Sequence, residues 1–325
     1  MSFPYQAVRR TTLLALTLAI AGLGATAHAE QRVIRIVVPY GTGAVQDTIA
    51  RAIGDELGQA LNAAIVVENR AGAGGTVGTA QVARAAPDGN TLVLAAASHH
   101  IAGYLYKNLS YDPYKDFTGV AYLGNTGYII LASAGLNVKN TSEFIQAVKT
   151  KPGAYDYASA GNGSASHLGM ASFLTAAGAQ MQHIPMKSTG EAVTELLAGR
   201  VQAVTAATIG VTAYRNDPRV TFLAYTGKTR SRFAPDLPTA AESGLPGYAF
   251  DSWLGLLAPA GLPAAERGKI NAAVNKVLAD PKVQARLASL GVETDVKTPE
   301  QFQDLLKADW EAAGKLVAAS GARVE

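Results

Sequence analysis

Two glycine-rich turns hold the residues best suited to bind a small ligand. The first turn, residues 40–44, follows the β-branched run 33–38 and precedes apolar residues at helical spacing. The second turn, residues 162–167, follows the strand-like segment 155–159 and adds hydroxyl and amide groups. Each has the order strand, glycine turn, helix start, and the unpaired backbone N–H groups at a helix N-terminus bind anions. The pattern therefore predicts two helix N-termini that hold a small carboxylate across a cleft. Neither turn contains Lys or Arg, and backbone N–H groups make none necessary.

The same turns also have a purely structural explanation, because most strand-to-helix turns only reverse the chain. Ser164 and Ser166 suit helix capping, Asn162 suits a turn, and a lone His167 suits a structural contact. The first turn is not a dinucleotide fingerprint, since Gln46 stands where the third glycine would be required. It is not a P-loop either, because no Gly-Lys-Ser/Thr follows. The sequence leaves capping and ligand binding open for these residues.

Composition excludes several classes of function. The 325 residues are 48% hydrophobic, which is enough for a large core and two domains. The net charge is +3 with scattered Lys and Arg, so we expect no nucleic-acid partner. The absence of cysteine excludes thiol catalysis and thiolate metal sites. No H-E-x-x-H is present, and a strand would point His99 and His100 in opposite directions, so we expect no metal and no cofactor.

The N-terminus has the pattern of a secretory signal peptide. Arg9 and Arg10 precede the apolar run 13–23, and Ala27-His28-Ala29 offers an A-x-A cleavage site. We therefore expect export to the periplasm and cleavage after about Ala29. A membrane anchor is less favoured, because the run is shorter than the ~20 apolar residues that a span needs. The export route, general secretory or twin-arginine, stays open.

Alternating strand and helix patterns predict a parallel α/β sheet with right-handed crossovers. Ligands of such sheets gather beyond the C-terminal ends of the strands, where residues 40–44 and 98–100 would both lie. Thr141 is predicted as a helix N-cap. The pattern further predicts strands at 64–68, 91–97 (ending in residues 98–100), 120–123 and 128–132, and helices at 77–85, 265–278, 281–290 and 300–320.

An enzyme is the less favoured class. No serine lies in a G-x-S-x-G sequence, so a nucleophile elbow is absent. Carboxylates at a fixed catalytic spacing are not apparent either, although sequence alone does not exclude a glycosidase pair. Binding is therefore favoured over catalysis.

Five segments together resemble a known family. They are VPYGTGAVQDTIAR (38–51), VVENRAGAGGTVGT (66–79), SAGNGSASHLG (159–169), LPTAAESGLPGY (237–248) and SWLGLLAPAGLP (252–263). With these segments the chain resembles the Bug family, the substrate-binding proteins of tripartite tricarboxylate transporters. The resemblance covers nearly all of the chain that follows the signal peptide.

The resemblance implies a type II periplasmic binding protein fold, α/β, with two domains and a ligand cleft between them. We expect a signal peptide at 1–29, a first domain at 30–128 and 254–325 onto which the C-terminal helices pack back, and a second domain at 129–253. The implied ligand-binding residues are Tyr40, Gly41, Thr42, Gly43, Ala44 and Asp47 in the first turn, Asn162, Gly163, Ser164, Ser166 and His167 in the second, and Ser98, Thr208 and the region 251–253, above all Asp251, beside the cleft.

The implied function is transport. A monomer would capture a small carboxylate between its domains and present it to the membrane permease subunits of a tripartite transporter. The alternative is the ligand-binding partner of a periplasmic signalling receptor. The chain departs from the family pattern at the first turn, which lacks the usual prolines, and at Ala203, where an aspartate is common. The resemblance therefore leaves the identity of the carboxylate open.

Overall fold

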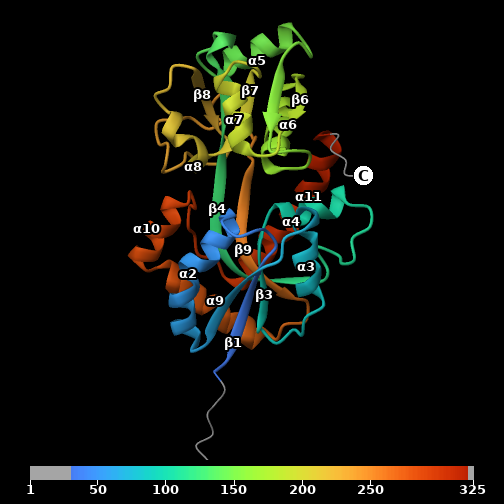
Figure 1. The fold of residues 1–325 in the computed structure, drawn as a ribbon, viewed down its shortest axis with the longest axis vertical. Coiled ribbons are helices and arrows are strands. Elements are labelled where there is room, and N and C mark those ends of the chain that lie inside the picture. The colour runs from blue at the N-terminus through green and yellow to red at the C-terminus, as the bar shows by residue number, and fades with distance from the viewer. Residues whose placement is uncertain (1–30, 321–325) are drawn as a thin grey trace, which may run out of the picture. The chain divides into compact units, whose positions relative to one another are not determined.

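A mixed sheet of nine strands runs through residues 31–320, the part of the chain that the computed structural model describes (Figure 1). Its main path has the order β2-β1-β3-β9-β4-β7-β5-β6, and β8 pairs with β4. The strands are β1 (Val33–Val38), β2 (Ala64–Asn69), β3 (Thr91–Ala96), β4 (Phe117–Ser133), β5 (Asp156–Ser159), β6 (Gln182–Pro185), β7 (Ala203–Ala207), β8 (Val220–Tyr225) and β9 (Asp251–Pro259).

Parallel pairs form both ends of this sheet. Strand β1 pairs in parallel with β2 and β3, and β5 pairs in parallel with β6 and β7. Helices connect these strands, so the parallel arrangement predicted from the sequence holds for these pairs, whereas β3, β4, β7 and β8 also form antiparallel pairs with β9 or β4 and make the sheet mixed. The helices are α2 (Val45–Leu61), α3 (Thr76–Ala83), α4 (Ser98–Leu105), α5 (Thr141–Thr150), α6 (Ala165–Ala177), α7 (Thr189–Leu197), α8 (Thr208–Val211), α9 (Ala264–Leu278), α10 (Pro281–Ser289) and α11 (Pro299–Ser320), with 3₁₀ turns at Ala73–Gly75, Ala134–Leu136 and Thr212–Tyr214.

Strand β4 connects the two ends of the sheet. Its first part pairs with β9, and its last part pairs with β7 and β8, in each case antiparallel. In Figure 1, β4 and β9 run side by side between the helices α2 and α3 and the group α5 to α8. The prediction of two separate strands at 120–123 and 128–132 is wrong. Gly124, with φ 142°, forms an irregularity within one strand instead of a turn, and Asn125 N–H donates to Glu293 O at 3.0 Å.

Buried apolar residues separate into clusters at this crossing. One cluster packs β1, β3 and β9 against α2 and α9, and it extends along β4 as far as Leu123. Two other clusters contain Ile130 and Ile129 respectively. Because successive side chains of a strand point to opposite faces, these two clusters cover the two faces of the β5 end of the sheet.

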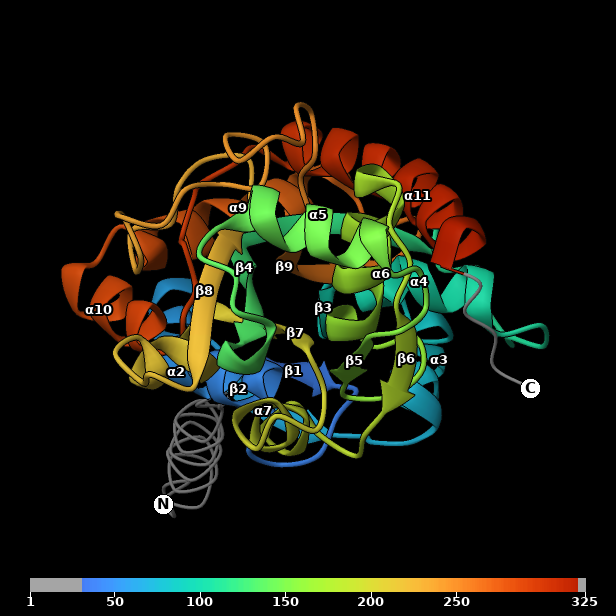
Figure 2. The same cartoon turned by 90° about the horizontal axis from the view of Figure 1, so that it is seen from above.

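A smaller apolar cluster draws on both ends of the sheet. It joins Ile101 and Leu105 of α4 to Leu168 of α6 and to Ala313 and Val317 of α11. Figures 1 and 2 both show α11 running beside α4 and α6. The C-terminal helix α11 therefore packs against both α4 and α6, which start on either side of the crossing strands.

Two local predictions are wrong. His99 and His100 lie in the first turn of α4 and not at the end of a strand, because β3 ends at Ala96 and the following residues are apolar at helical spacing. The N-cap of α5 is Asn140, whose side chain accepts a hydrogen bond from Glu143 N–H, and not Thr141. Thr141 instead donates its hydroxyl hydrogen to Leu223 O at 3.0 Å.

The C-terminal helices agree with the sequence prediction to within one residue at each end. The predicted signal peptide, residues 1–29, lies outside the described residues. Among residues 31–320, no helix has both the length and the apolar character required to span a membrane.

The crossing of β4 and β9 leaves no room for a side chain at Gly127. A Cβ added there would lie 1.8 Å from Tyr225 Oη, and Tyr225 is buried. We expect Gly127→Ala to lower the free energy of unfolding by about 1–3 kcal/mol, because overpacking displaces the core around it. Urea unfolding followed by circular dichroism measures this.

The matched control is Gly268→Ala, within α9, where an added Cβ meets nothing within 4 Å. Alanine in a helix interior is favoured over glycine by about 0.5–1 kcal/mol, so this variant should be stabilised. Equal unfolding midpoints for the two variants would show that the crossing tolerates a side chain.

Candidate functional site

A cavity of about 410 Å³ lies where strands β1, β3 and β5 end and helices α2, α4 and α6 begin. The crossing strands close one side of it. None of the described residues that line it carries a charged side chain. The lining residues are Tyr40, Gln46, Gly74, Ala96, Ala97, Ser98, Ile101, Ala102, Leu105, Tyr106, Tyr128, Ala160, Asn162, Gly163, Ser164, Ala165, Phe250 and Ser252.

Three helix N-termini contribute to this lining. Gln46 belongs to the first turn of α2, Ser98 begins α4, and Ser164 is the N-cap of α6. Each helix N-terminus carries the equivalent of roughly half a positive charge, spread over unpaired N–H groups. The cavity is therefore electropositive through its backbone and not through Lys or Arg.

The three helices are capped differently. Helix α2 starts after Ala44, which is extended (φ −63°, ψ 158°) and offers no side-chain cap, and α4 also lacks a side-chain cap. No described residue accepts a hydrogen bond from the backbone N–H of Gln46 or Asp47. In contrast, Ser164 Oγ caps α6 by accepting from His167 N–H at 3.2 Å. The free donors of α2 are thus open to a ligand, while Ser164 Oγ occupies one donor of α6 and leaves the N–H groups of Ala165 and Ser166 without an acceptor among the described residues.

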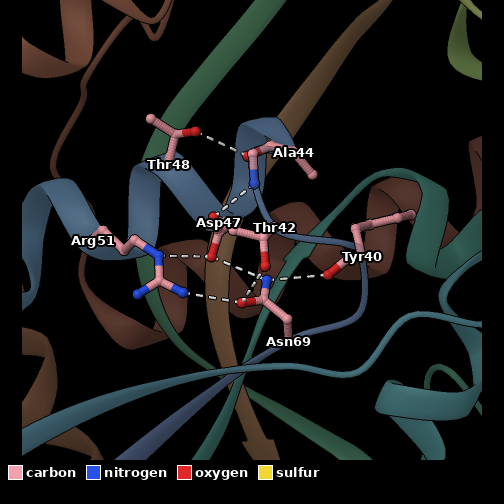
Figure 3. A network of polar contacts seen from close by, with 8 residues as sticks. Tyr40, Thr42, Ala44, Asp47, Thr48, Arg51 and Asn69 are labelled. Atoms are coloured by element: carbon pink, nitrogen blue, oxygen red, sulfur yellow. Dashed lines mark hydrogen bonds and ion pairs between the residues drawn. The ribbon is translucent and has the colours of Figure 1, made fainter.

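A buried carboxylate holds the first turn in place (Figure 3). Asp47 accepts hydrogen bonds from Gly43 N–H at 2.9 Å, Arg51 Nε at 2.9 Å and Asn69 Nδ2 at 3.0 Å. Asn69 Nδ2 also donates to Tyr40 O at 3.1 Å, so one amide joins both ends of the turn. Burial raises the pKa of Asp47, but the hydrogen bonds from Arg51, Gly43 and Asn69 outweigh it and hold the pKa below its usual value. Asp47 is therefore ionised at neutral pH and supports the turn from behind.

Tyr40 and Ser98 form the side of the cavity above this turn. Their hydroxyl groups lie 2.9 Å apart, so a ligand would meet a linked pair of hydroxyls. Burial raises the pKa of Tyr40, although its hydrogen bond with Ser98 lowers it, so the phenol stays protonated and able to donate.

Two stacked histidines hold the second turn. Gly163 N–H donates to His167 Nδ1 at 3.1 Å, so this nitrogen carries no proton. The rings of His167 and His183 lie 3.9 Å apart at an angle of 11°, and His183 Nε2 lies 2.6 Å from Ser159 Oγ. Burial lowers the pKa of His167; burial, with His167 nearby, lowers that of His183 to about 4. The second turn therefore rests on neutral imidazoles.

The cavity lining includes five of the residues predicted from the sequence: Tyr40, Ser98, Asn162, Gly163 and Ser164. The other predicted residues do not line it. Gly41, Thr42, Gly43 and Ala44 form the turn beside it, Asp47, Ser166 and His167 lie behind the turns, and Thr208 and Asp251 bond to Gly127 O and Asn125 Nδ2.

Several lining residues escaped the sequence analysis. Ser252 belongs to the predicted region 251–253, but Phe250 precedes it, and strand alternation turns both to the face opposite Asp251. Alternation along β9 could have found Phe250. Ile101 and Leu105 belong to α4, which was not predicted as a helix, and Tyr106 follows its last residue.

No group of three or more His, Asp or Glu side chains in the described part of the chain could hold a metal ion.

Comparison with known proteins gives a consistent result. The profile described as tripartite tricarboxylate transporter family receptor (TctC) matches residues 49–322. BugT from Bordetella pertussis is 29% identical and covers 98% of this chain and 99% of its own. MatC from Rhodopseudomonas palustris, solved with bound malate, is 33% identical with a TM-score of 0.73 and covers 88% and 99%. Rpa4515 from R. palustris, solved with adipate, is 26% identical with a TM-score of 0.77 and covers 91% and 100%.

These similarities establish the fold as the mixed α/β fold of type II periplasmic binding proteins, as predicted.

The Asp47 contacts predict a stability effect. Asp47→Ala removes three part-buried hydrogen bonds to a buried carboxylate, so we expect a loss of about 1–3 kcal/mol in the free energy of unfolding at pH 7. Because the folded pKa lies below the unfolded one, this loss should shrink as the pH falls through both values. Urea unfolding at pH 7 and pH 3 measures it. Asp55→Ala, exposed on the same helix, should stay within about 0.5 kcal/mol of the parent.

The buried histidines predict a pH dependence with a defined sign. Their folded pKa values, about 4 for His183 and about 3 for His99, lie below the ordinary value, so the unfolded chain binds more protons at mildly acidic pH. The contribution of these neutral histidines to the free energy of unfolding is therefore fully present above about pH 6.5 and is lost as the pH drops toward 4. Thermal unfolding from pH 7.5 to 4.5 should show this fall, with a shallower slope for His183→Gln. Identical slopes would contradict the assignment to His183.

Proposed function

This chain belongs to the receptor family of tripartite tricarboxylate transporters, and on that premise we propose that it captures one small organic carboxylate in the cavity for delivery to a membrane permease. The family consists of transport receptors, so the expectation of binding and not catalysis is confirmed. The predicted membership of the Bug group of proteins is confirmed as well.

The observation that carries the carboxylate proposal is the convergence of α2, α4 and α6 on one cavity without charged side chains. Unpaired N–H groups and hydroxyls suit a carboxylate, because each oxygen accepts several hydrogen bonds. Exclusion of water by the bound ligand strengthens each of these contacts. The malate and adipate bound by relatives support a carboxylate as the ligand class.

We further propose that the two ends of the sheet act as domains that close on the ligand, with boundaries at 30–128 with 254–325, and at 129–253. The apolar clusters support this division, because they separate between Leu123 and Ile129 on β4. Strands β4 and β9 are then the hinge, and small changes in their backbone angles would move one domain against the other.

The proposed setting is the periplasm, where a monomeric receptor meets its permease. The support is the family and the sequence pattern of residues 1–29. The second candidate, partnership with a signalling receptor, uses the same cavity. Carboxylate uptake by a strain that lacks this chain distinguishes them: loss of uptake supports transport, and unchanged uptake with lost induction supports signalling.

A cap introduced at α2 tests the binding mode. Ala44→Asp places a carboxylate where the structure has an uncapped, extended N-cap, so we expect a gain in stability of about 1 kcal/mol. The same carboxylate competes with the ligand for the N–H donors and repels its charge. Affinity for malate or adipate should fall at least about tenfold, which corresponds to 1.4 kcal/mol. Thermal unfolding and isothermal titration calorimetry measure the two effects.

Ala44→Asn is the matched control, because it caps the helix without adding charge and should weaken binding less than Ala44→Asp does. Ser164→Ala should destabilise α6 by about 1 kcal/mol through loss of its cap. If Ala44→Asp stabilises the chain and binds carboxylates as tightly as the parent, the ligand does not bind at α2.

A further inference from the structure

One wall of the cavity is aromatic and apolar. Tyr128 and Phe250 lie on the crossing segments with ring centroids 5.5 Å apart, and both line the cavity. Leu105 and Tyr106, at the end of α4, continue this wall. Three of these residues, Phe250, Leu105 and Tyr106, also belong to or pack against the apolar cluster of α4, α6 and α11, so the wall is supported from behind.

The phenols on this wall are uncharged at neutral pH. Burial raises the pKa of Tyr128 to about 12, and burial raises that of Tyr40. A neutral ring surface favours stacking with another ring, and aromatic pairs gain free energy beyond the area that they bury.

The helix N-termini at the cavity without a side-chain cap are those of α2 and α4, and Tyr40 and Ser98 link them through their hydroxyls. The α6 side differs: Gly163 and His167 donate their N–H groups within the chain. A Cβ on Gly163 would lie 2.5 Å from Leu105 Cδ1, so the second turn rests against an apolar side chain.

A second carboxylate on the ligand would meet the side-chain-capped end of α6, where Asn162 and Ser164 offer only neutral polar groups, and Leu105. No Lys, Arg or His lines the cavity among the described residues, so no cation would balance it. Removing a charge from water without a partner is strongly unfavourable. The site thus holds one anionic group well and a second one poorly.

We propose that the ligand is a monocarboxylate with an aromatic ring as its body, its carboxylate at the N-termini of α2 and α4 and its ring against Tyr128 and Phe250. This inference rests on the proposed function, because it specifies the class of carboxylate that the same cavity takes. It differs from the ligands of the relatives compared above, since malate and adipate are aliphatic dicarboxylates.

Titration of the purified full chain with matched ligands tests the proposal. Benzoate and terephthalate share one ring and differ by a second carboxylate, and adipate supplies two carboxylates without a ring. Isothermal titration calorimetry should give benzoate the highest affinity, at least about tenfold above terephthalate and adipate, because the second charge meets no cation in the cavity lining. Phenylacetate should bind like benzoate.

The outcomes separate this inference from the proposed function. If adipate or terephthalate binds as tightly as benzoate or more tightly, the proposal of an aromatic monocarboxylate is wrong, while the proposed capture of carboxylates is supported. If none of the four ligands binds but malate does, only this inference is wrong; if malate does not bind either, both are wrong. Retained ligand is removed first by unfolding and refolding.

Two variants test the wall itself. Phe250→Leu keeps an apolar side chain but removes the ring, so benzoate affinity should fall by about fivefold, within the range of one aromatic pair, while adipate affinity stays unchanged. Phe233→Leu, the same substitution at a half-buried position outside the lining, should change neither. An equal loss for benzoate and adipate in Phe250→Leu would assign it a structural role only.

Tyr106→Lys adds the missing cation at a half-buried lining position. The ratio of terephthalate to benzoate affinity should rise at least about tenfold, as expected for a charge pair in a partly enclosed site. An unchanged ratio in a folded variant would show that charge balance does not set the preference.

Discussion

The carboxylate of Asp47 is the contact on which the first side of the cavity depends. By accepting from Gly43 N–H, Arg51 and Asn69, it fixes a glycine turn whose other end is held through Tyr40 O. The helix that follows starts without a side-chain cap, so its free N–H groups remain open. A negative charge inside the protein thus holds the loop, while the backbone around it presents a positive potential to the ligand.

The two turns solve the same problem with different chemistry. The first uses an ionised carboxylate, and the second uses neutral histidines that are stacked and accept a backbone hydrogen bond. The carboxylate of the first turn accepts hydrogen bonds at neutral pH and loses this capacity when acid protonates it. The neutral imidazole of the second turn also stops accepting in acid, because its acceptor nitrogen becomes protonated. Both glycine turns are therefore held most firmly near neutral pH.

A binding site without charged side chains has a clear consequence for a transport receptor. Backbone donors fixed by the fold need little reorganisation when the ligand arrives. They attract an anionic ligand through partial charges and not through a full ion pair. Release to a partner is then easier than from a buried salt bridge, whose separation leaves an unpaired charge. In the proposed mechanism, the hinge at β4 and β9 and the apolar contacts of α11 set how far the cavity opens.

Local sequence determined much of the architecture. The alternation of strands and helices, the two glycine turns and the C-terminal helices follow from side-chain periodicity, glycine freedom and capping, which act over a few residues. The family followed from five segments in a fixed order, and the family profile bears it out. The binding of carboxylates by this chain itself stays a proposal.

Only the tertiary structure decided which side chains line the cavity. Tyr128 lies on a long crossing strand that was predicted as two strands, and Phe250 precedes the other crossing strand. Leu105 lies on a helix that follows its strand without a side-chain cap. Ser166 and His167 carry suitable polar groups, yet both support the second turn from behind. Lining depends on contacts between segments more than a hundred residues apart, and no local pattern records such contacts.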